Sequence, residues 1–205
     1  MKILLINPAF NKYGGVSGHG GTMMPLNLAY IASYTRKHLD CKIKILDAEI
    51  LAISHEQSVE QACAYSPNLI GITANTCVFD SVITLCALLK AKLPNVPIAL
   101  GGPHPSALPE QSLLDTGADY SIMGEGEISF AALAKSLMNN SPIQAIAGIA
   151  WRGEEQHINV NPSQSLIENL DLLPFPARDL LDNQSYRPPP NKKCQPWSQY
   201  TSCYK

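Results

Sequence analysis

Glycines and small polar residues gather in a few short segments of this 205-residue sequence. Three of the segments read Thr73-Ala74-Asn75-Thr76, Gly101-Gly102-Pro103-His104 and Gly124-Glu125-Gly126-Glu127, and a longer one runs from Asn7 to Met24 with five glycines. Glycine lets a backbone approach a ligand closely, and short hydroxyl or amide side chains supply directed hydrogen bonds. These residue types therefore indicate a ligand-binding surface.

Each segment also has an ordinary structural explanation. Gly-Gly and Gly-x-Gly pairs after strands are usually turns. His104 taken alone is explained as a hydrogen-bonded loop residue, and Glu125 and Glu127 as acidic residues favoured in the first turn of a helix. The ligand-binding interpretation is favoured because each of the three short segments follows a predicted strand, so that all three would meet at one edge of a sheet.

The elements that position these segments alternate between strand and helix over the first 140 residues. Five apolar runs are predicted strands: Lys2–Asn7, Lys42–Ala48, Leu69–Asn75, Pro97–Gly101 and Tyr120–Met123. Such near-continuous apolar runs are typical of a parallel sheet covered on both faces. Strands that alternate with helices form right-handed βαβ units. We therefore predict an α/β fold, a doubly wound five-stranded parallel sheet of the flavodoxin-like or Rossmann-like type, with strand order 2-1-3-4-5.

Local signals mark the helices between these strands. Ser54-His55-Glu56-Gln57 has the form of a capping box, and Pro109 and Gly117 suit the first turn and the end of a short helix. Two apolar stripes predict the buried faces of two further helices. They consist of Val82, Cys86, Leu89 and Leu93, and of Phe130, Leu133, Ala134, Leu137 and Met138.

The pattern changes after residue 145. Gly148–Arg152 and His157–Asn161 flank a polar turn and predict a β-hairpin. Leu170–Leu181 is punctuated by prolines, and Pro188-Pro189-Pro190 opens a polar tail, a composition typical of a linker or a frayed terminus rather than a packed core. We therefore predict a ligand-binding domain over residues 1–145, a hairpin and linker over 146–182, and a flexible tail over 183–205.

The overall composition excludes several classes of protein. Hydrophobic residues make up 45% of the chain, charged residues 16%, and the net charge is −2. A nucleic-acid-binding protein would need clustered basic residues, and no apolar run is long enough to span a membrane. The N-terminal apolar run stops at Asn7-Pro8, too early for a signal peptide. We predict a cytoplasmic protein with neither nucleic-acid nor membrane partners, whose six cysteines, with no C-x-x-C pair, are reduced thiols.

Familiar sites of α/β proteins can be tested against the same loops. A phosphate-binding G-x-x-x-x-G-K-[ST] loop and a Gly-x-Ser-x-Gly elbow are both absent. Asn7-Pro8 and Gly124-Glu125 stand where a phosphoreceiver domain needs acidic residues and a lysine. The first loop lacks the close G-x-G-x-x-G turn, but Asp47 ends the second predicted strand, so a dinucleotide site is weakened without being excluded.

Several longer stretches, weak singly and specific together, carry a resemblance to a known family. They are Ile3-Leu4-Leu5-Ile6-Asn7-Pro8, Pro25-Leu26-Asn27-Leu28-Ala29-Tyr30-Ile31-Ala32, Ile70-Gly71-Ile72-Thr73, the segment from Gly101 to Glu110, Gly124-Glu125-Gly126-Glu127 and the segment from Asn169 to Asp179. On these residues the chain resembles the N-terminal cobalamin-binding region of B12-dependent radical SAM proteins, the group that includes anaerobic magnesium-protoporphyrin monomethyl ester cyclase. The resemblance covers nearly the whole chain.

This resemblance implies a corrin ring over the strand ends, with its nucleotide tail in a groove beside the sheet. Residues 1–145 would be the cobalamin-binding domain, and Gly101 and Gly102 would leave room for the tail. The implied cofactor-binding residues are Pro8, Gly15, Thr73, Asn75, Thr76, Gly101, Gly102, Pro103, His104, Gly124, Glu125, Gly126 and Glu127.

The sequence departs from other cobalamin domains at the expected cobalt ligand. Domains of the methionine-synthase kind carry Asp-x-His-x-x-Gly after the first strand, and here Ala9 stands in place of the histidine. His19, between two glycines of the same loop, is the less favoured substitute, because ordering a flexible loop costs entropy. We predict a base-off cofactor with no protein histidine on cobalt.

A second departure concerns the radical chemistry. The family continues into a barrel whose C-x-x-x-C-x-x-C motif holds a [4Fe–4S] cluster and S-adenosylmethionine, whereas the last residues here offer only Cys194 and Cys203. These cofactors are expected in a missing radical SAM domain, supplied in cis or in trans, and whether this chain alone is an enzyme stays open. The alternatives are a nucleotide- or nucleotide-sugar-binding enzyme domain and an interaction domain without a ligand.

Overall fold

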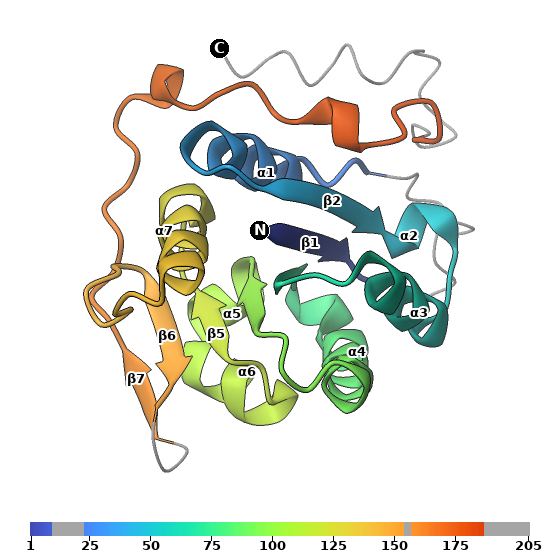
Figure 1. Ribbon diagram of the computed structural model, residues 1–205, viewed down its shortest axis with the longest axis horizontal. Coiled ribbons are helices and arrows are strands. Elements are labelled where there is room, and N and C mark those ends of the chain that lie inside the picture. The colour runs from blue at the N-terminus through green and yellow to red at the C-terminus, as the bar shows by residue number, and fades with distance from the viewer. Residues whose placement is uncertain (10–22, 154–156, 187–205) are drawn as a thin grey trace.

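The computed structural model describes residues 1–9, 23–153 and 157–186. In chain order its elements are β1 (Lys2–Asn7), α1 (Leu26–His38), β2 (Lys42–Asp47), α2 (Ala48–Leu51), α3 (His55–Tyr65), β3 (Leu69–Thr73), η3 (Thr76–Val78), α4 (Phe79–Lys92), β4 (Ile98–Gly101), α5 (Pro103–Ala107), α6 (Pro109–Thr116), β5 (Tyr120–Ile122), α7 (Gly126–Asn139), β6 (Ile149–Arg152), β7 (Ile158–Val160), η5 (Leu170–Leu172) and η6 (Arg178–Leu180). The strands form one sheet in the order β2-β1-β3-β4-β5-β6-β7 (Figure 1).

The first five strands are parallel, and their order confirms the predicted topology. The predicted hairpin, whose turn lies partly outside the described residues, supplies β6 and β7. It is not a separate appendage, because β6 pairs antiparallel with β5, Tyr120 standing opposite Trp151. The boundary predicted at residue 145 therefore falls between α7 and a strand of the same sheet.

Alternate residues of each strand face two different helical layers. Ile3 and Leu5 of β1 belong to an apolar cluster with α1 and α7, and Leu4 and Ile6 to a second cluster with α3, α4 and α6. Figure 1 shows these two groups of helices on opposite sides of the sheet. Because both faces are covered, the strands need apolar residues at successive positions, as the sequence has them.

The predicted helix signals are present at atomic detail. The Ser54 hydroxyl accepts from the Gln57 amide at 3.2 Å, and the Gln57 side chain accepts from the Ser54 amide at 2.9 Å, which completes the capping box. Pro109 is the first residue of α6, and Gly117 ends that helix with φ of +67°. These local predictions are confirmed.

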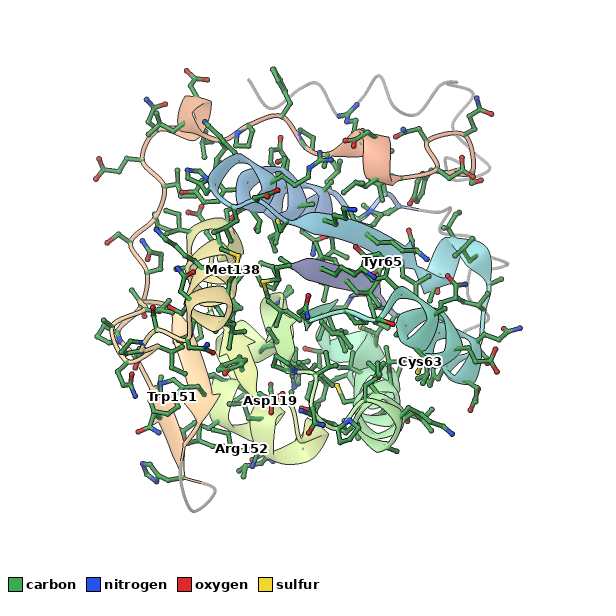
Figure 2. All side chains as sticks on the ribbon, viewed as in Figure 1. Cys63, Tyr65, Asp119, Met138, Trp151 and Arg152 are labelled. Carbon is green, nitrogen blue, oxygen red and sulfur yellow. The ribbon has the colours of Figure 1, made fainter. Side chains whose placement is uncertain are left out.

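The two predicted stripes are buried except near their ends. Val82, Cys86, Leu89, Phe130, Leu133 and Ala134 are buried, and Leu93 and Leu137 are partly buried. The prediction for Met138 is wrong, since its side chain is 42% exposed on α7 (Figure 2). Met138 lies in the last turn, beside Leu137, at the border of the stripe where a helix turns away from the core.

Residues 163–186, which we call the strap, run back past α1 (Figure 1). Ala177, Leu181 and Tyr186 are buried in the α1 layer, and the Ala177 amide donates to the Ala29 carbonyl at 3.0 Å. Two further bonds, of 2.8 and 3.0 Å, join Arg36 to Asp179. The expectation that Leu170–Leu181 has no packed core is therefore wrong, because single inward residues anchor a segment without apolar periodicity. The triproline lies outside the described residues.

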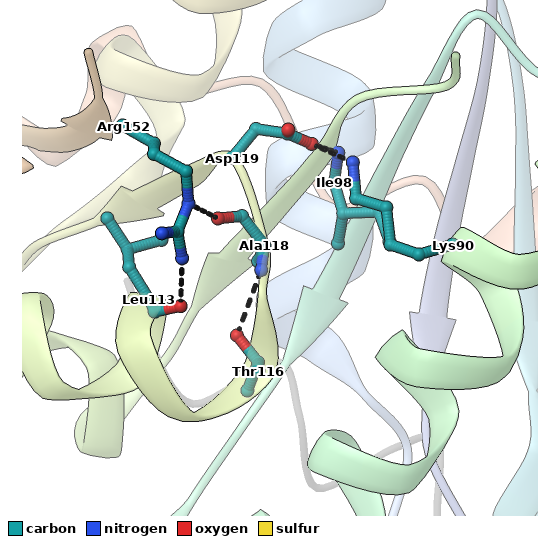
Figure 3. Close-up of polar contacts among 7 residues, drawn as sticks. All are labelled: Lys90, Ile98, Leu113, Thr116, Ala118, Asp119 and Arg152. Carbon is teal, nitrogen blue, oxygen red and sulfur yellow. Dashed lines mark hydrogen bonds and ion pairs between the residues drawn. The ribbon is translucent and has the colours of Figure 1, made fainter. Parts of the chain in front are cut away.

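A cluster of polar bonds holds the amino-terminal edge of the sheet (Figure 3). The Asp119 carboxylate accepts from Lys90 at 2.6 Å and from the Ile98 amide at 2.7 Å. Arg152 donates to the carbonyls of Leu113 and Ala118. These bonds tie the starts of β4 and β5 to α4 and α6. Within the described ranges, no helix is long and apolar enough to cross a bilayer.

Candidate functional site

The three predicted loops meet at the carboxyl-terminal edge of the sheet. Thr73, the last residue of β3, stands beside Gly101, the last residue of β4. The Ala74 amide donates to the Gly101 carbonyl at 2.7 Å, and the Gly124 amide donates to the Ser106 hydroxyl at 2.9 Å. The loops after β3, β4 and β5 therefore form one connected surface.

A cavity of about 180 Å³, which we call the groove, opens between the sheet and helices α1 and α7. Its walls are mostly apolar and include Leu5, Ile31, Ile122 and Phe130. Gly71, in the wall of the groove, is tightly packed: a β-carbon there would stand 2.7 Å from Leu5 Cδ2. An apolar groove with a few polar residues at its mouth suits a flat organic group.

A second cavity of about 720 Å³, the strand-end cavity, lies over the ends of β1 and β3. Asn27 and Thr73 line both cavities, and the side-chain amide of Asn27 donates to the Thr73 hydroxyl at 2.8 Å. The groove and the strand-end cavity therefore adjoin each other at this pair.

Gly101 and Gly102 have different reasons to be glycine. A β-carbon on Gly101 would meet nothing within 4 Å, so the space beside it in the groove is open. Gly102 has φ of +105°, and its β-carbon would stand 2.6 Å from the Ala74 carbonyl oxygen. The interpretation that Gly102 keeps space for a ligand is corrected by this contact, since its own backbone requires glycine.

Most of the predicted cofactor-binding residues lie in the two cavities. Those lining the groove are Thr73, Gly101, Gly102, Gly124, Glu125, Gly126 and Glu127. Those lining the strand-end cavity are Pro8, Thr73, Asn75, Thr76 and Pro103. Gly15 and His19 lie outside the described residues.

His104 stands apart from the other predicted residues and lines neither cavity. It belongs to the first turn of α5, where its ring stacks on Phe79 with 3.7 Å between centroids. Its Nδ1 lies 3.2 Å from the Thr76 hydroxyl. Through its contacts with Phe79 and Thr76, His104 therefore stabilises the turn after β3.

Several lining residues were not predicted as ligand contacts. Asn27 is the second residue of α1 and lines both cavities, and Cys77 follows Thr76 in the lining of the strand-end cavity. Ile31 and Phe130 form walls of the groove. The stretch from Pro25 to Ala32 carried a signal for α1, but an apolar pattern does not tell a cavity wall from a filled core.

The two acidic residues after β5 differ in their surroundings. Glu125 Oε2 accepts from the Ile167 amide at 2.7 Å, which ties the strap to the mouth of the groove. Glu127 is half-buried in the first turn of α7, and burial raises the pKa of its carboxyl, with a smaller contribution from Glu125. The protonated form of Glu127 is therefore favoured more than in an exposed glutamate.

Asp47 is engaged with protein groups on both of its oxygens. The side-chain amide of Asn7 donates to Oδ1 at 2.8 Å, and the hydroxyl of the buried Tyr186 donates to Oδ2 at 2.8 Å. An acidic residue that recognises a ribose needs a free oxygen toward the ligand. This network weakens the dinucleotide alternative further.

Metal ligation by the protein itself finds no support in the described parts of the chain. No group of three or more His, Cys, Asp or Glu side chains there is arranged to hold an ion, and Cys41, Cys63, Cys77 and Cys86 are free. Burial raises the pKa of the Cys86 thiol to about 12, so that it is a core residue without thiolate character.

Comparison with known families decides between the remaining interpretations. Residues 16–134 match the B12 binding domain. The chain belongs to this B12-binding family. The match spans the loops after β3, β4 and β5, and the B12-binding domain is the family that the sequence resemblance indicated.

Curated relatives of this B12-binding domain are much longer than the chain. An uncharacterized methyltransferase of Pyrococcus horikoshii is 31% identical over 192 residues, which cover 91% of this chain and 40% of that protein. The anaerobic magnesium-protoporphyrin IX monomethyl ester cyclase of Synechocystis is 32% identical over 177 residues, 84% of this chain and 34% of the cyclase. The chain thus spans about a third to two fifths of these relatives.

Solved structures share the fold of the B12-binding domain. The cobalamin-dependent S-adenosylmethionine radical enzyme OxsB, solved with aqua-cobalamin and S-adenosylmethionine, has a TM-score of 0.74 at 20% identity, over 87% of this chain and 24% of OxsB. The radical S-adenosylmethionine methyltransferase TsrM of Kitasatospora setae, solved with cobalamin and a [4Fe–4S] cluster, has a TM-score of 0.67 at 18% identity, over 89% of this chain and 34% of TsrM.

Proposed function

We propose that this B12-binding domain holds a corrinoid with the corrin ring over the strand-end cavity and the nucleotide tail in the groove. The observation that carries this proposal is the open space beside Gly101, in an apolar groove that adjoins the strand-end cavity at Asn27 and Thr73. Ligands of open α/β sheets bind at this edge, where the strand order reverses.

The described residues fit such a cofactor chemically. Leu5, Ile31 and Phe130 offer apolar walls to the flat base of the tail. Asn75 and Thr76, at the strand-end cavity, offer polar groups to the amide side chains of a corrin. When bound, cobalamin supplies a cobalt ion that can carry and transfer an alkyl group, while the protein binds and orients it.

The lower face of the cobalt receives no histidine in our proposal. His38, His55, His104 and His157 lie within the described residues, and none of them lines the groove or the strand-end cavity. His55 Nε2 is engaged with the Ser81 hydroxyl at 3.0 Å. A base-off cofactor whose displaced base lies in the groove agrees with these positions.

We further propose that the parent protein is a radical SAM methyltransferase or cyclase of the cytoplasm. One curated relative is named a methyltransferase and another a cyclase, the chain spans less than half of each, and OxsB and TsrM, which share the fold, are described as radical S-adenosylmethionine enzymes. The [4Fe–4S] cluster and S-adenosylmethionine would belong to a radical SAM domain in cis or in trans. In this arrangement the cobalamin-binding unit includes the hairpin and the strap, because both pack on the sheet or on α1.

Substitution of Gly101 by leucine tests the proposed position of the tail. Gly101→Leu adds a side chain into open space of the groove, so the fold should be retained while the tail is excluded. We expect the dissociation constant for hydroxocobalamin to rise at least about tenfold, as the loss of about 1.4 kcal/mol of binding requires. The measurement is absorbance of protein-bound corrinoid after gel filtration.

Ala91→Leu is the matched control for this substitution. Ala91 is exposed near the end of α4, at the opposite edge of the sheet, and receives the same leucine side chain without approaching the groove. Its corrinoid affinity should equal that of the natural chain. Retention of full affinity by Gly101→Leu would show that the tail lies elsewhere. A colourless chain that binds a nucleotide instead would support the nucleotide-binding alternative, and a chain that binds neither would support an interaction domain.

A further inference from the structure

Glu127 is a half-buried carboxyl in the wall of the groove. It is the second residue of α7, and within the described residues its carboxyl accepts a hydrogen bond only from its own backbone amide. Its neighbour Glu125 is different, because Glu125 is already bonded to the Ile167 amide of the strap. Glu127 is therefore the carboxyl of the groove that remains for a ligand.

The surroundings of Glu127 are such that a hydrogen-bond partner would stabilise its carboxyl. The groove around it is built from apolar side chains such as Ile122 and Phe130. A carboxyl in such surroundings is stabilised when it finds a hydrogen-bond partner and destabilised when it does not. Burial raises the pKa of Glu127 and a bond from its own backbone amide lowers it, and a proton shared with a basic ring nitrogen would satisfy this carboxyl whichever of the two groups carries the proton.

We infer that Glu127 selects the corrinoid by a hydrogen bond, through one shared proton, to the free ring nitrogen of its lower base. This inference rests on the proposed function, in which the base lies in the groove and not on cobalt. A benzimidazole or purine base then has a ring nitrogen with an unshared electron pair, and burial of that acceptor without a donor would weaken binding. A corrinoid with a phenolic base places a smaller aromatic ring in the groove and has no such nitrogen.

Three corrinoids of graded structure provide the test. Cobalamin carries a benzimidazole base, a p-cresol-based cobamide carries a ring without nitrogen, and cobinamide lacks the nucleotide tail altogether. Cobalamin must release its base from cobalt before that base can enter the groove, which the p-cresol-based cobamide need not do, so the hydrogen bond is measured as the change in the ratio of the two dissociation constants when Glu127 is substituted. We expect this ratio to change about tenfold, the difference that one buried hydrogen bond supplies. Dissociation constants come from absorbance titration or equilibrium dialysis, with no enzymatic activity involved.

Glu127→Met and Glu127→Gln assign this change to the side chain. Methionine keeps the unbranched shape and loses the hydrogen-bonding group, so the dissociation constant for cobalamin should rise about tenfold relative to that for the p-cresol-based cobamide, with cobinamide affinity unchanged within about twofold. Glutamine keeps an N–H donor and should leave the ratio close to that of the natural chain. Glu110→Met is the matched control, since Glu110 is the second residue of α6, is exposed and lies outside both cavities.

The outcomes separate this inference from the proposed function. A ratio in Glu127→Met equal to that of the natural chain, with cobinamide binding more weakly than the p-cresol-based cobamide, would overturn the role of Glu127 and leave the groove intact as the tail site. Failure of all three corrinoids to bind the natural chain would overturn the proposed function itself.

Discussion

Gly101 and Gly102 show how two adjacent identical residues can serve different ends. In the sequence they form one pair, and a pair of glycines at a strand end is explained equally well by a turn and by a ligand. The structure separates the two explanations, because Gly101 borders open space and Gly102 is required by a positive φ and by contact with Ala74. Backbone angles of this kind follow from tertiary contacts, which a residue pattern does not contain.

Electron paramagnetic resonance tests the prediction about the cobalt ligand. We expect the cob(II)alamin-loaded chain to show no nitrogen superhyperfine splitting from a protein histidine or from the displaced base. The physical reason is that His104 is held against Phe79 and Thr76, and His55 against Ser81, so that neither lines a cavity. Splitting that disappears in His19→Ala would contradict this and would identify His19, outside the described residues, as the ligand.

At the scale of elements, the strap is the segment that sequence patterns described least well. Strands and helices are marked by periodic apolar residues and capping signals, and those predictions were confirmed. The strap has no period, and its burial depends on Ala177, Leu181 and Tyr186 meeting surfaces of α1 and β2 that exist only after folding. The prediction that Met138 is buried was wrong for a related reason, since the position at which an apolar stripe leaves the core depends on the elements packed around the helix.

We predict that Tyr186→Phe lowers the free energy of unfolding by about 1–3 kcal/mol, because the buried Asp47 loses a charge-assisted hydrogen bond.

Asp179→Asn should change the free energy of unfolding by less than about 1 kcal/mol, since the Arg36–Asp179 pair is exposed. Urea denaturation followed by circular dichroism measures both.

Tyr34→Phe is the control for the loss of a hydroxyl, because the Tyr34 hydroxyl makes no hydrogen bond to another described residue. Its free energy of unfolding should stay within about 0.5 kcal/mol of the natural value. A Tyr186→Phe variant as stable as Tyr34→Phe would show that the bond to Asp47 contributes nothing to anchoring the strap.

At the scale of the whole molecule, the two edges of the sheet have separate duties. The carboxyl-terminal edge carries the glycines and both cavities, and the amino-terminal edge carries the Lys90–Asp119 pair and the bonds of Arg152 (Figure 3). Topology alone predicted which edge would bind a ligand, because parallel strands end together. The groove beside the sheet was implied by the family resemblance, but its volume and walls were not predictable, since they depend on how closely α1 and α7 approach the sheet.

This division of duties predicts the effect of Asp119→Ala. The substitution removes the acceptor of the Ile98 amide and of Lys90, so the free energy of unfolding should fall by about 1–3 kcal/mol. The affinity for hydroxocobalamin should stay within about twofold, because Asp119 lies at the edge away from both cavities. Urea denaturation and corrinoid titration of the same preparation check the two halves. A large loss of affinity in a still-folded variant would contradict the separation of the edges.

The antiparallel hairpin has a consequence for how the chain is made. Until β6 has been synthesised, β5 is an edge strand with unpaired amides and carbonyls, open to other newly made chains. The parallel part of the sheet is complete in sequence at Ile122, and β6 ends at Arg152. At ordinary rates of translation this gap corresponds to about 2–6 seconds. During that interval the unpaired side of β5 is a place where a neighbouring chain can pair.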